Sequence, residues 1–293
     1  MKQKILVLPF IILYFGIILI TLSTAAEKPD SGKHSAIVEA DGYVYLADDK
    51  TIRQLREEAL AQAKREALEK GQTFIKSVST VENFQLTYDL IQSAAEGYVK
   101  ILESKDLGIT GDNRYHYWVK AEIEYRLQPP GDLEQKALDT DPDAPLTVTV
   151  LTNKENYKKG ENIKIFIKGN KDFYARVLYM DAQGNKLQLV PNQQRTENFF
   201  KGGVTHVIPD PSDKFTLEVN PPFGSEKIIV YASTSPQGQV QTTAAGLSLY
   251  KIESDIKTVN AQTRGVIIKE SIGMTPAGAE FFETSCEVKT NSK

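Results

Sequence analysis

The chain is poor in the residue types that most often carry chemistry. Cys286 is its single cysteine, which excludes an internal disulfide and any CxxC metal site. The three histidines, His34, His116 and His206, stand far apart, and none has the HxH or HExxH spacing of a zinc site. The sequence also lacks the G-x-S-x-G, G-x-x-x-x-G-K-[ST] and G-x-G-x-x-G motifs of hydrolases and nucleotide-binding proteins. We therefore expect no enzyme activity, no cofactor and no metal.

An excess of positive charge is also missing. The chain has 35 Lys and Arg against 38 Asp and Glu, a net charge of −3, so it offers no electrostatic reason to bind nucleic acid. Hydrophobic residues make up 41% and charged residues 25%, which is typical of folded globular proteins. A length of 293 residues is enough for two domains of roughly 100–150 residues each.

The one long apolar run lies at the beginning of the chain. Lys2 and Lys4 precede an apolar stretch at 5–22, and small residues follow up to Ala26. This pattern predicts a signal peptide at 1–26 and export to the periplasm or cell envelope. A run of about 18 apolar residues also approaches the minimum for a spanning helix, so an uncleaved inner-membrane anchor at 5–22 is the alternative. Membrane contact is expected through this segment only.

Residues 27–127 have the pattern of a small α/β module, with two helices packed on an antiparallel sheet. The expected elements are strands at 36–45, 73–81, 98–107 and 115–127 and helices at 51–71 and 87–96. Gly42 is expected to mark a bulge or bend in the first strand, and Gly71 to end the first helix. The small-residue ridge Ala59, Ala63 and Ala67 would let that helix pack closely on the sheet.

The strand at 115–127 has the clearest two-residue alternation in the sequence. Its odd positions are mostly apolar and its even positions mostly polar, which predicts one buried and one solvated face. Glu122 and Glu124 are therefore expected in solvent. Trp118 is the exception on the polar face, where an exposed indole can mark a binding surface. The alternative is that Trp118 covers a neighbouring strand or the second domain.

This module resembles a known envelope domain. The A-x-x-x-A-x-x-x-A helix, the β-branched run through Val78 and Val81, and the G-Y-V-K-I-L…Y-W-V-K-A-E-I-E-Y hairpin are similar to the N-terminal domain of flagellar assembly protein T and to small surface lipoproteins of that type. The resemblance covers about residues 36–127. It implies an envelope scaffold or binding domain, without implying a flagellar role.

Residues 128–145 are rich in proline and acidic residues, and we interpret them as a solvated linker. Asp139, Asp141 and Asp143 have the spacing that begins a calcium loop, but the required glycine and glutamate are absent. Short strands separated by turn signals then fill 146–290 and predict a β-sandwich domain, so the whole chain is expected to be α+β. The expected strands are at 146–151, 163–168, 173–180, 186–190, 205–208, 215–219, 227–232, 265–270 and 279–288. Whether 251–290 belongs to the sandwich stays open.

The second domain resembles the family catalogued as domain of unknown function 4384, over about residues 146–250. The motifs that carry the resemblance are Tyr157-x-x-Gly160-Glu161, Asn170-x-Asp172-x-Tyr174, Tyr179-x-Asp181-x-x-Gly184, Leu189-x-Pro191-Asn192, Ile208-Pro209 and Pro221-Pro222-x-Gly224. The family brings no established activity. Most of these residues are typical of turns. Tyr174, Tyr179 and Asn192, with Phe199 or Phe200, are the candidates for a recognition surface; packing inside the sandwich is the alternative.

The sequence thus predicts a non-enzymatic binding or assembly protein of the bacterial cell envelope, with a β-sandwich interaction domain. Its partner would be an envelope protein or a polysaccharide. One alternative is an enzyme or enzyme-accessory protein whose site forms between the two domains, with His116 or His206 beside carboxylates. The other is a purely structural envelope spacer.

Overall fold

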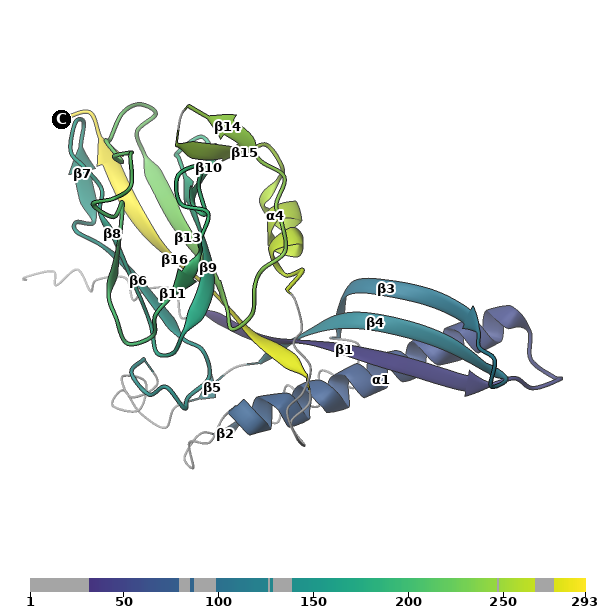
Figure 1. The fold of residues 1–293 in the computed structure, drawn as a ribbon. Helices are drawn as coiled ribbons and strands as arrows, with labels where there is room; N and C mark the ends of the chain where they lie inside the picture. The colour runs from purple at the N-terminus through teal and green to yellow at the C-terminus, as the bar shows by residue number, and fades with distance from the viewer. Residues whose placement is uncertain are drawn as a thin grey trace, which may run out of the picture.

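The computed structural model describes residues 32–78, 85–86, 99–125, 127–128, 139–246, 248–266 and 277–293. The predicted signal peptide and the helix expected at 87–96 lie outside these ranges. No helix within them is long and apolar enough to cross a membrane. The described fold is α+β, with a projecting arm joined to a larger β region (Figure 1).

The arm consists of β1 (Lys33–Tyr45), α1 (Ile52–Val78), β3 (Lys100–Ile109) and β4 (Arg114–Tyr125). β4 pairs antiparallel with β1 on one side and with β3 on the other, which confirms the predicted hairpin. α1 covers one face of this sheet, where it buries the apolar side of β4 as the alternation predicted. A separate two-stranded ladder joins β2 (Gln85–Leu86) to β5 (Leu127–Gln128).

The prediction of a strand at 73–81 is wrong, because α1 continues to Val78, where this described part of the chain ends. Phe74 and Ile75 are buried and continue the apolar stripe of the helix beyond Ala67. Gly71 lies inside the helix instead of ending it, and a Cβ there would come within 2.8 Å of the Ile123 side chain. Packing on the sheet has overridden the local β propensity of this segment.

Gly42 permits a close approach between β1 and α1. The pairing of β1 with β4 runs through Gly42 without a register shift, so the expected bulge is absent. A Cβ at this position would lie 2.0 Å from the Ala59 carbonyl oxygen and 2.5 Å from the Ala63 nitrogen. The alanine ridge therefore packs on the arm's own sheet, as expected.

The β region contains most of the remaining strands and one short helix. They are β6 (Val148–Thr152), β7 (Asn156–Lys158), β8 (Ile165–Gly169), β9 (Phe173–Met180), β10 (Lys186–Val190), β11 (Phe199–Phe200), β12 (His206–Ile208), β13 (Ser225–Ser233), β14 (Thr243–Ala245), β15 (Leu249–Ile252), α4 (Ile256–Thr263) and β16 (Gly278–Asn291). The strand expected at 215–219 is reduced to a single bridge between Asn162 and Glu218. The one expected at 265–270 lies largely outside the described residues.

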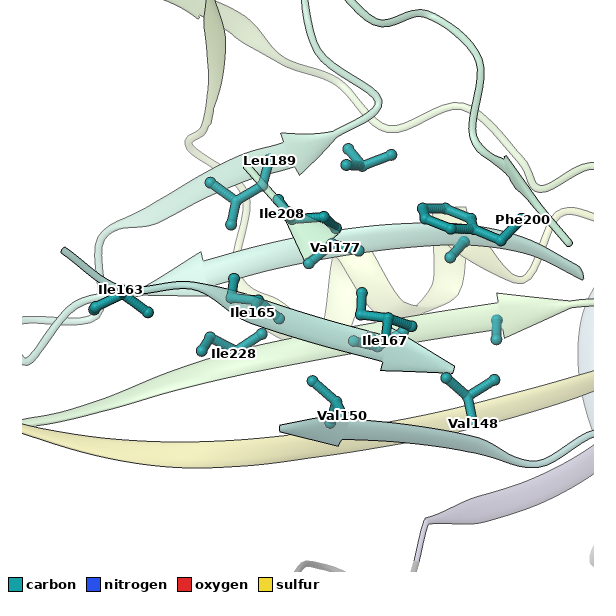
Figure 2. Close-up of a cluster of buried hydrophobic side chains, with 14 of the residues drawn as sticks. Val148, Val150, Ile163, Ile165, Ile167, Val177, Leu189, Phe200, Ile208 and Ile228 are labelled. Carbon is teal, nitrogen blue, oxygen red and sulfur yellow. The ribbon is translucent and has the colours of Figure 1, made fainter. Parts of the chain in front are cut away.

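A small sheet of β12, β8 and β6 lies over the large sheet and shares a core with it. Figure 2 shows Ile165 and Ile167 of β8 facing Val177 of β9 and Ile228 of β13. The end of the expected linker is fixed to this region instead of being solvated. The Asn170 side-chain amide donates to the carbonyl oxygens of Asp141, Ala144 and Pro145, at 2.8, 3.1 and 3.1 Å.

β16 joins the arm to the β region. It pairs antiparallel with β13 on one side and with β1 on the other, within a sheet ordered β14-β15-β10-β9-β13-β16-β1-β4-β3. The predicted final strand is therefore confirmed, and it belongs to the large sheet. α4 was not predicted; it begins after Asp255, whose carboxylate caps the helix by accepting from the backbone N–H groups of Lys257 and Thr258.

Candidate functional site

The sheet face of the arm opposite α1 carries Trp118 in the middle of a row of aromatic and charged side chains. Trp118 is half-buried, and its neighbours in register are Asp41 on β1 and Lys105 on β3. The Lys105 ammonium lies over the indole, 4.4 Å from the ring centroid. One face of the indole is thus covered by a cation.

Tyr43 and His116 continue this row toward the free end of the arm. Their rings are stacked with centroids 4.3 Å apart, and the Arg114 guanidinium lies 4.3 Å from the Tyr43 centroid. His116 Nε2 is 2.7 Å from a carboxylate oxygen of Asp41. His116 is therefore held by an aspartate and a tyrosine of β1, and no second carboxylate of the described residues pairs with it.

The charges of this face are paired locally. Lys120 contacts Glu39 at 3.1 Å, Lys105 contacts Glu103 at 3.2 Å, and the Arg114 Nε–H donates to Asp112 at 2.6 Å. The hydrogen bonds from Arg114 and Thr110 lower the pKa of Asp112 to about 2. Pairing of this kind leaves no excess of positive charge for a polyanion.

Large apolar side chains gather at the free end of the arm. Tyr45 ends β1, Ile52 begins α1, and Leu107 and Ile109 lie in the last part of β3. Their exposed fractions are 72%, 50%, 50% and 54%, and they are four of the eight strongly exposed large hydrophobic residues in the described part of the chain. We call Tyr45, Ile52, Leu107 and Ile109 the arm tip. Large apolar residues exposed at the same end of an element commonly mark an interaction site.

Side-chain contacts fix the strands and the helix directly below the arm tip. The Tyr115 hydroxyl donates to Asp106 at 2.8 Å, and Arg56 Nε lies 2.6 Å from the same carboxylate. Burial alone would raise the pKa of Asp106, but its hydrogen bonds from Tyr115 and Gly108 and the Arg56 charge lower it. These contacts join β3, β4 and α1 directly below the exposed residues.

A buried ionic cluster holds the other end of this face against α4. Glu122 was expected in solvent, but it is fully buried. It pairs with Arg264 at the end of α4, and it accepts hydrogen bonds of 2.8 Å from Ser35 and from Lys100. Burial opposes ionisation of Glu122, but the positive charges of Arg264 and Lys100 lower its pKa. Glu124, two residues later, is exposed as expected.

The predicted recognition residues of the β region do not form one surface. Tyr174 and Tyr179 are five residues apart on β9, so their side chains point to opposite faces of the sheet. Tyr174 is half-buried and packs edge-on against exposed Phe199, with centroids 5.3 Å apart. The Tyr179 hydroxyl donates to buried Glu226, and burial together with this carboxylate raises the pKa of Tyr179.

Asn192 and Phe200 are part of the interior. Asn192 is 1% exposed, and its side-chain oxygen accepts from the backbone N–H groups of Gln194 and Arg195, at 2.9 and 2.7 Å. Its amide group donates to the Leu189 carbonyl at 2.9 Å, so the side chain closes a turn. Phe200 is buried and stacks on Phe173, with centroids 5.2 Å apart.

The residues that could carry chemistry lie apart. His206 is 3.0 Å from the Lys201 carbonyl oxygen and packs edge-on against Phe200. Cys286 is a strand residue of β16, and burial raises the pKa of its thiol to about 12, so the thiol stays protonated at neutral pH. Among the described residues, no three His, Cys, Asp or Glu side chains are placed to hold a metal ion.

The family described as Domain of unknown function (DUF4384) matches residues 156–236. This match supports the resemblance of the second part of the chain, over a shorter range than expected. The glycines and prolines of its motifs lie in or beside turns: Gly160 and Gly184 have φ values of +82° and +84°, and Pro191 and Pro209 follow cis peptide bonds. Its tyrosines Tyr174 and Tyr179 lie on β9. No curated protein and no solved structure matches the chain. The resemblance to flagellar assembly protein T is therefore unsupported.

Proposed function

We propose that the chain is a non-enzymatic binding or assembly protein of the bacterial cell envelope, and that it contacts its partner through the arm tip. The signal-like segment at 1–26 motivates the envelope location. The β region, where two sheets share a core, supports a β-sandwich domain. In this proposal the β region carries the arm and the arm reaches the partner.

The arm tip is the observation that supports a binding role best. Four large apolar side chains are exposed at the end of a projecting element, and Trp118, Tyr43 and Arg114 follow on the sheet face opposite α1. Tryptophan, tyrosine and arginine are the residues that contribute most often to binding hot spots between proteins. Because the charges nearby are paired, the proposed partner is a protein that contributes an apolar surface of its own.

The test compares two double variants, each of which loses two aliphatic side chains of similar fractional exposure. Ile52→Ser with Ile109→Ser changes the arm tip, whereas Leu151→Ser with Val204→Ser changes equally exposed positions of the β region. Cross-linking of each protein in envelope extracts, followed by mass spectrometry, identifies the partner and measures its yield. We expect the tip variant to lose at least tenfold in yield and the control to keep the wild-type value.

Thermal unfolding of both variants shows whether the fold is kept. An equal yield from a folded tip variant would contradict the proposed contact surface. If wild-type protein cross-links to no envelope protein at all, the binding role itself is wrong.

A further inference from the structure

A buried polar layer lies between α4 and the large sheet. Tyr231 of β13 pairs in register with Arg176 of β9 on one side and with Glu283 of β16 on the other, so the three side chains form a row on the same sheet face. Asn260, Thr263 and Arg264, at helical spacing, reach this row from α4. Arg176 and Arg264 are thus two buried guanidinium groups under the same helix.

The half of the layer around Arg264 is fully paired. Its guanidinium contacts two carboxylates, those of Glu122 and Glu283, the second at 2.8 Å. The Asn260 amide donates to Glu283 at 3.0 Å. Buried charges are normally compensated in this way, because an unpaired ion in the interior costs several kcal/mol.

In the half of the layer around Arg176, the buried guanidinium is bonded to neutral groups only. Arg176 is 5% exposed, and its terminal N–H groups donate to the Gly238 carbonyl at 3.1 Å and to the Thr263 hydroxyl at 2.9 Å. Among the described residues no carboxylate lies within ion-pair distance of it. Burial lowers the pKa of Arg176 to about 10, which leaves it charged at neutral pH. This positive charge has only neutral partners.

Four buried polar atoms without a hydrogen bond belong to this layer and to the residues beside it. Among the described residues, the buried atoms without a hydrogen bond include Arg176 Nε, Tyr231 Oη, Gln237 Oε1 and Gln262 Oε1. Gln237 is close to the row because its amide donates to the Tyr231 carbonyl at 2.7 Å. The backbone of Gln262 lies beside Gly238, the residue whose carbonyl accepts from Arg176, because the Gly238 N–H donates to the carbonyl of Thr263, the next residue, at 3.3 Å. Burial raises the pKa of Tyr231 to about 12, so its hydroxyl is protonated, and it lies near Asn260 without hydrogen-bond geometry.

We propose that the Arg176 half of this layer binds a small carboxylate that also carries a hydroxyl or amino group. Arg176 Nε–H and the Tyr231 hydroxyl donate to the carboxylate, which compensates the buried charge. Gln237 Oε1 and Gln262 Oε1 accept from the hydroxyl or amino group of the ligand. The orphaned donors and acceptors are then all satisfied by one molecule. A bound water would satisfy some of these atoms but would leave the guanidinium without a counter-charge.

The experiment measures thermal unfolding of the full chain during titration with sodium glycolate, glycine or sodium acetate, at constant ionic strength set with sodium chloride. Ligands that bind only the folded state raise the Tm in a saturable way. We expect glycolate or glycine to saturate at a lower concentration than acetate, which lacks the second polar group. Sodium chloride alone is expected to give no saturable rise.

Three variants locate the effect. Arg176→Met is expected to abolish it, Tyr231→Phe to raise the half-saturating concentration at least fivefold, and Arg65→Met, which removes an exposed guanidinium on α1, to leave it unchanged. Tyr231→Phe removes a single oxygen and keeps the test decisive if Arg176→Met does not fold. The proposal is overturned if none of the three compounds gives a saturable rise, or if Tyr231→Phe responds as the wild type does.

A crystal structure grown with glycolate gives a direct second measurement. Ligand density that bridges Arg176 Nε and Tyr231 Oη supports the proposal, whereas water alone at these atoms overturns it. The layer lies between α4 and the sheet, away from the arm tip, so neither outcome depends on the proposed partner of the tip.

Discussion

His34 is a side chain whose burial links stability to pH. Its ring lies between Phe282 and Tyr125, with centroids 4.6 and 5.5 Å away, where the arm meets the β region. Its Nδ1 atom is buried without a hydrogen-bond partner. Burial lowers the pKa of His34 from 6.5 to about 4, and a hydrogen bond with the backbone of Leu146 opposes this only in part.

The first prediction follows from the sign of this shift. Between pH 6.5 and 4 the unfolded chain binds the His34 proton and the folded chain does not, so stability is full above pH 6.5 and falls as the pH drops toward 4. The loss is at most about 3 kcal/mol. We expect His34→Leu to lack this part of the slope, measured by urea unfolding at pH 7.5 and pH 5. Equal differences between the two pH values in both proteins would contradict it.

At the scale of the residue, sequence analysis located Trp118 on the outer face of the arm but could not distinguish Glu122 from Glu124. Both glutamates occupy the same face of the same strand, and their local sequence is alike. Only Glu122 is opposite Arg264, which lies 142 residues later in the chain. A contact between residues so far apart in the sequence leaves no signal in the local pattern of polar and apolar residues.

At the scale of the element, the contact between β1 and α1 depends on a missing side chain. The atoms that a Cβ on Gly42 would meet belong to the backbone of α1. They cannot move away by a change of rotamer, as the atoms of a flexible side chain could. The helix must shift away from the sheet to admit even a methyl group, and the alanine contacts on either side would open with it.

The second prediction is that Gly42→Ala lowers the free energy of unfolding by about 1–3 kcal/mol, as over-packing in a close contact usually does. Gly111→Ala is the matched control, because a Cβ there meets nothing within 4 Å. Urea unfolding of both variants is the measurement. Similar stabilities for the two variants would show that α1 adapts without loss.

Element boundaries were predictable where a period was repeated and a cap was present. The alternation of β4 and the alanine spacing of α1 gave the right structures at the right places. The prediction was wrong at 73–78, where β-branched residues indicated a strand. Phe74 and Ile75 continue the three- and four-residue spacing of the buried side of α1, and this spacing was the signal for a helix. α4 was missed because eight residues with few apolar positions give little periodicity; its signal was the capping residue Asp255.

At the scale of the whole molecule, the Glu122–Arg264 pair joins the arm to the segment that covers the β region. Three groups compensate the Glu122 carboxylate, two of them charged. Neutralising it leaves Arg264 buried with Glu283 as the one remaining carboxylate that pairs with it among the described residues. The two parts of the molecule would then depend on the pairing of β1 with β16 and on the packing of Ile37 against the β region.

The third prediction is that Glu122→Gln lowers the free energy of unfolding by about 3 kcal/mol, because it removes one charge of a buried pair. Glu124→Gln, on the same face but exposed, is expected to change it by less than about 0.5 kcal/mol. Urea unfolding measures both. Hydrogen exchange of the α4 amides should also accelerate in Glu122→Gln alone; unchanged exchange would mean that the pair does not hold the helix.

The central position of β16 determines when the large sheet can be completed during synthesis of the chain. Lys33 of β1 pairs with Glu283 of β16, so the ribosome must add 250 residues before β1 can pair along the edge that faces β16. At roughly 5–20 residues per second, β1 waits on the order of 10–50 seconds with one edge open. β13 waits for the same strand on its other side. The arm can form early around α1, but the sheet is joined only when the last described strand has been synthesised.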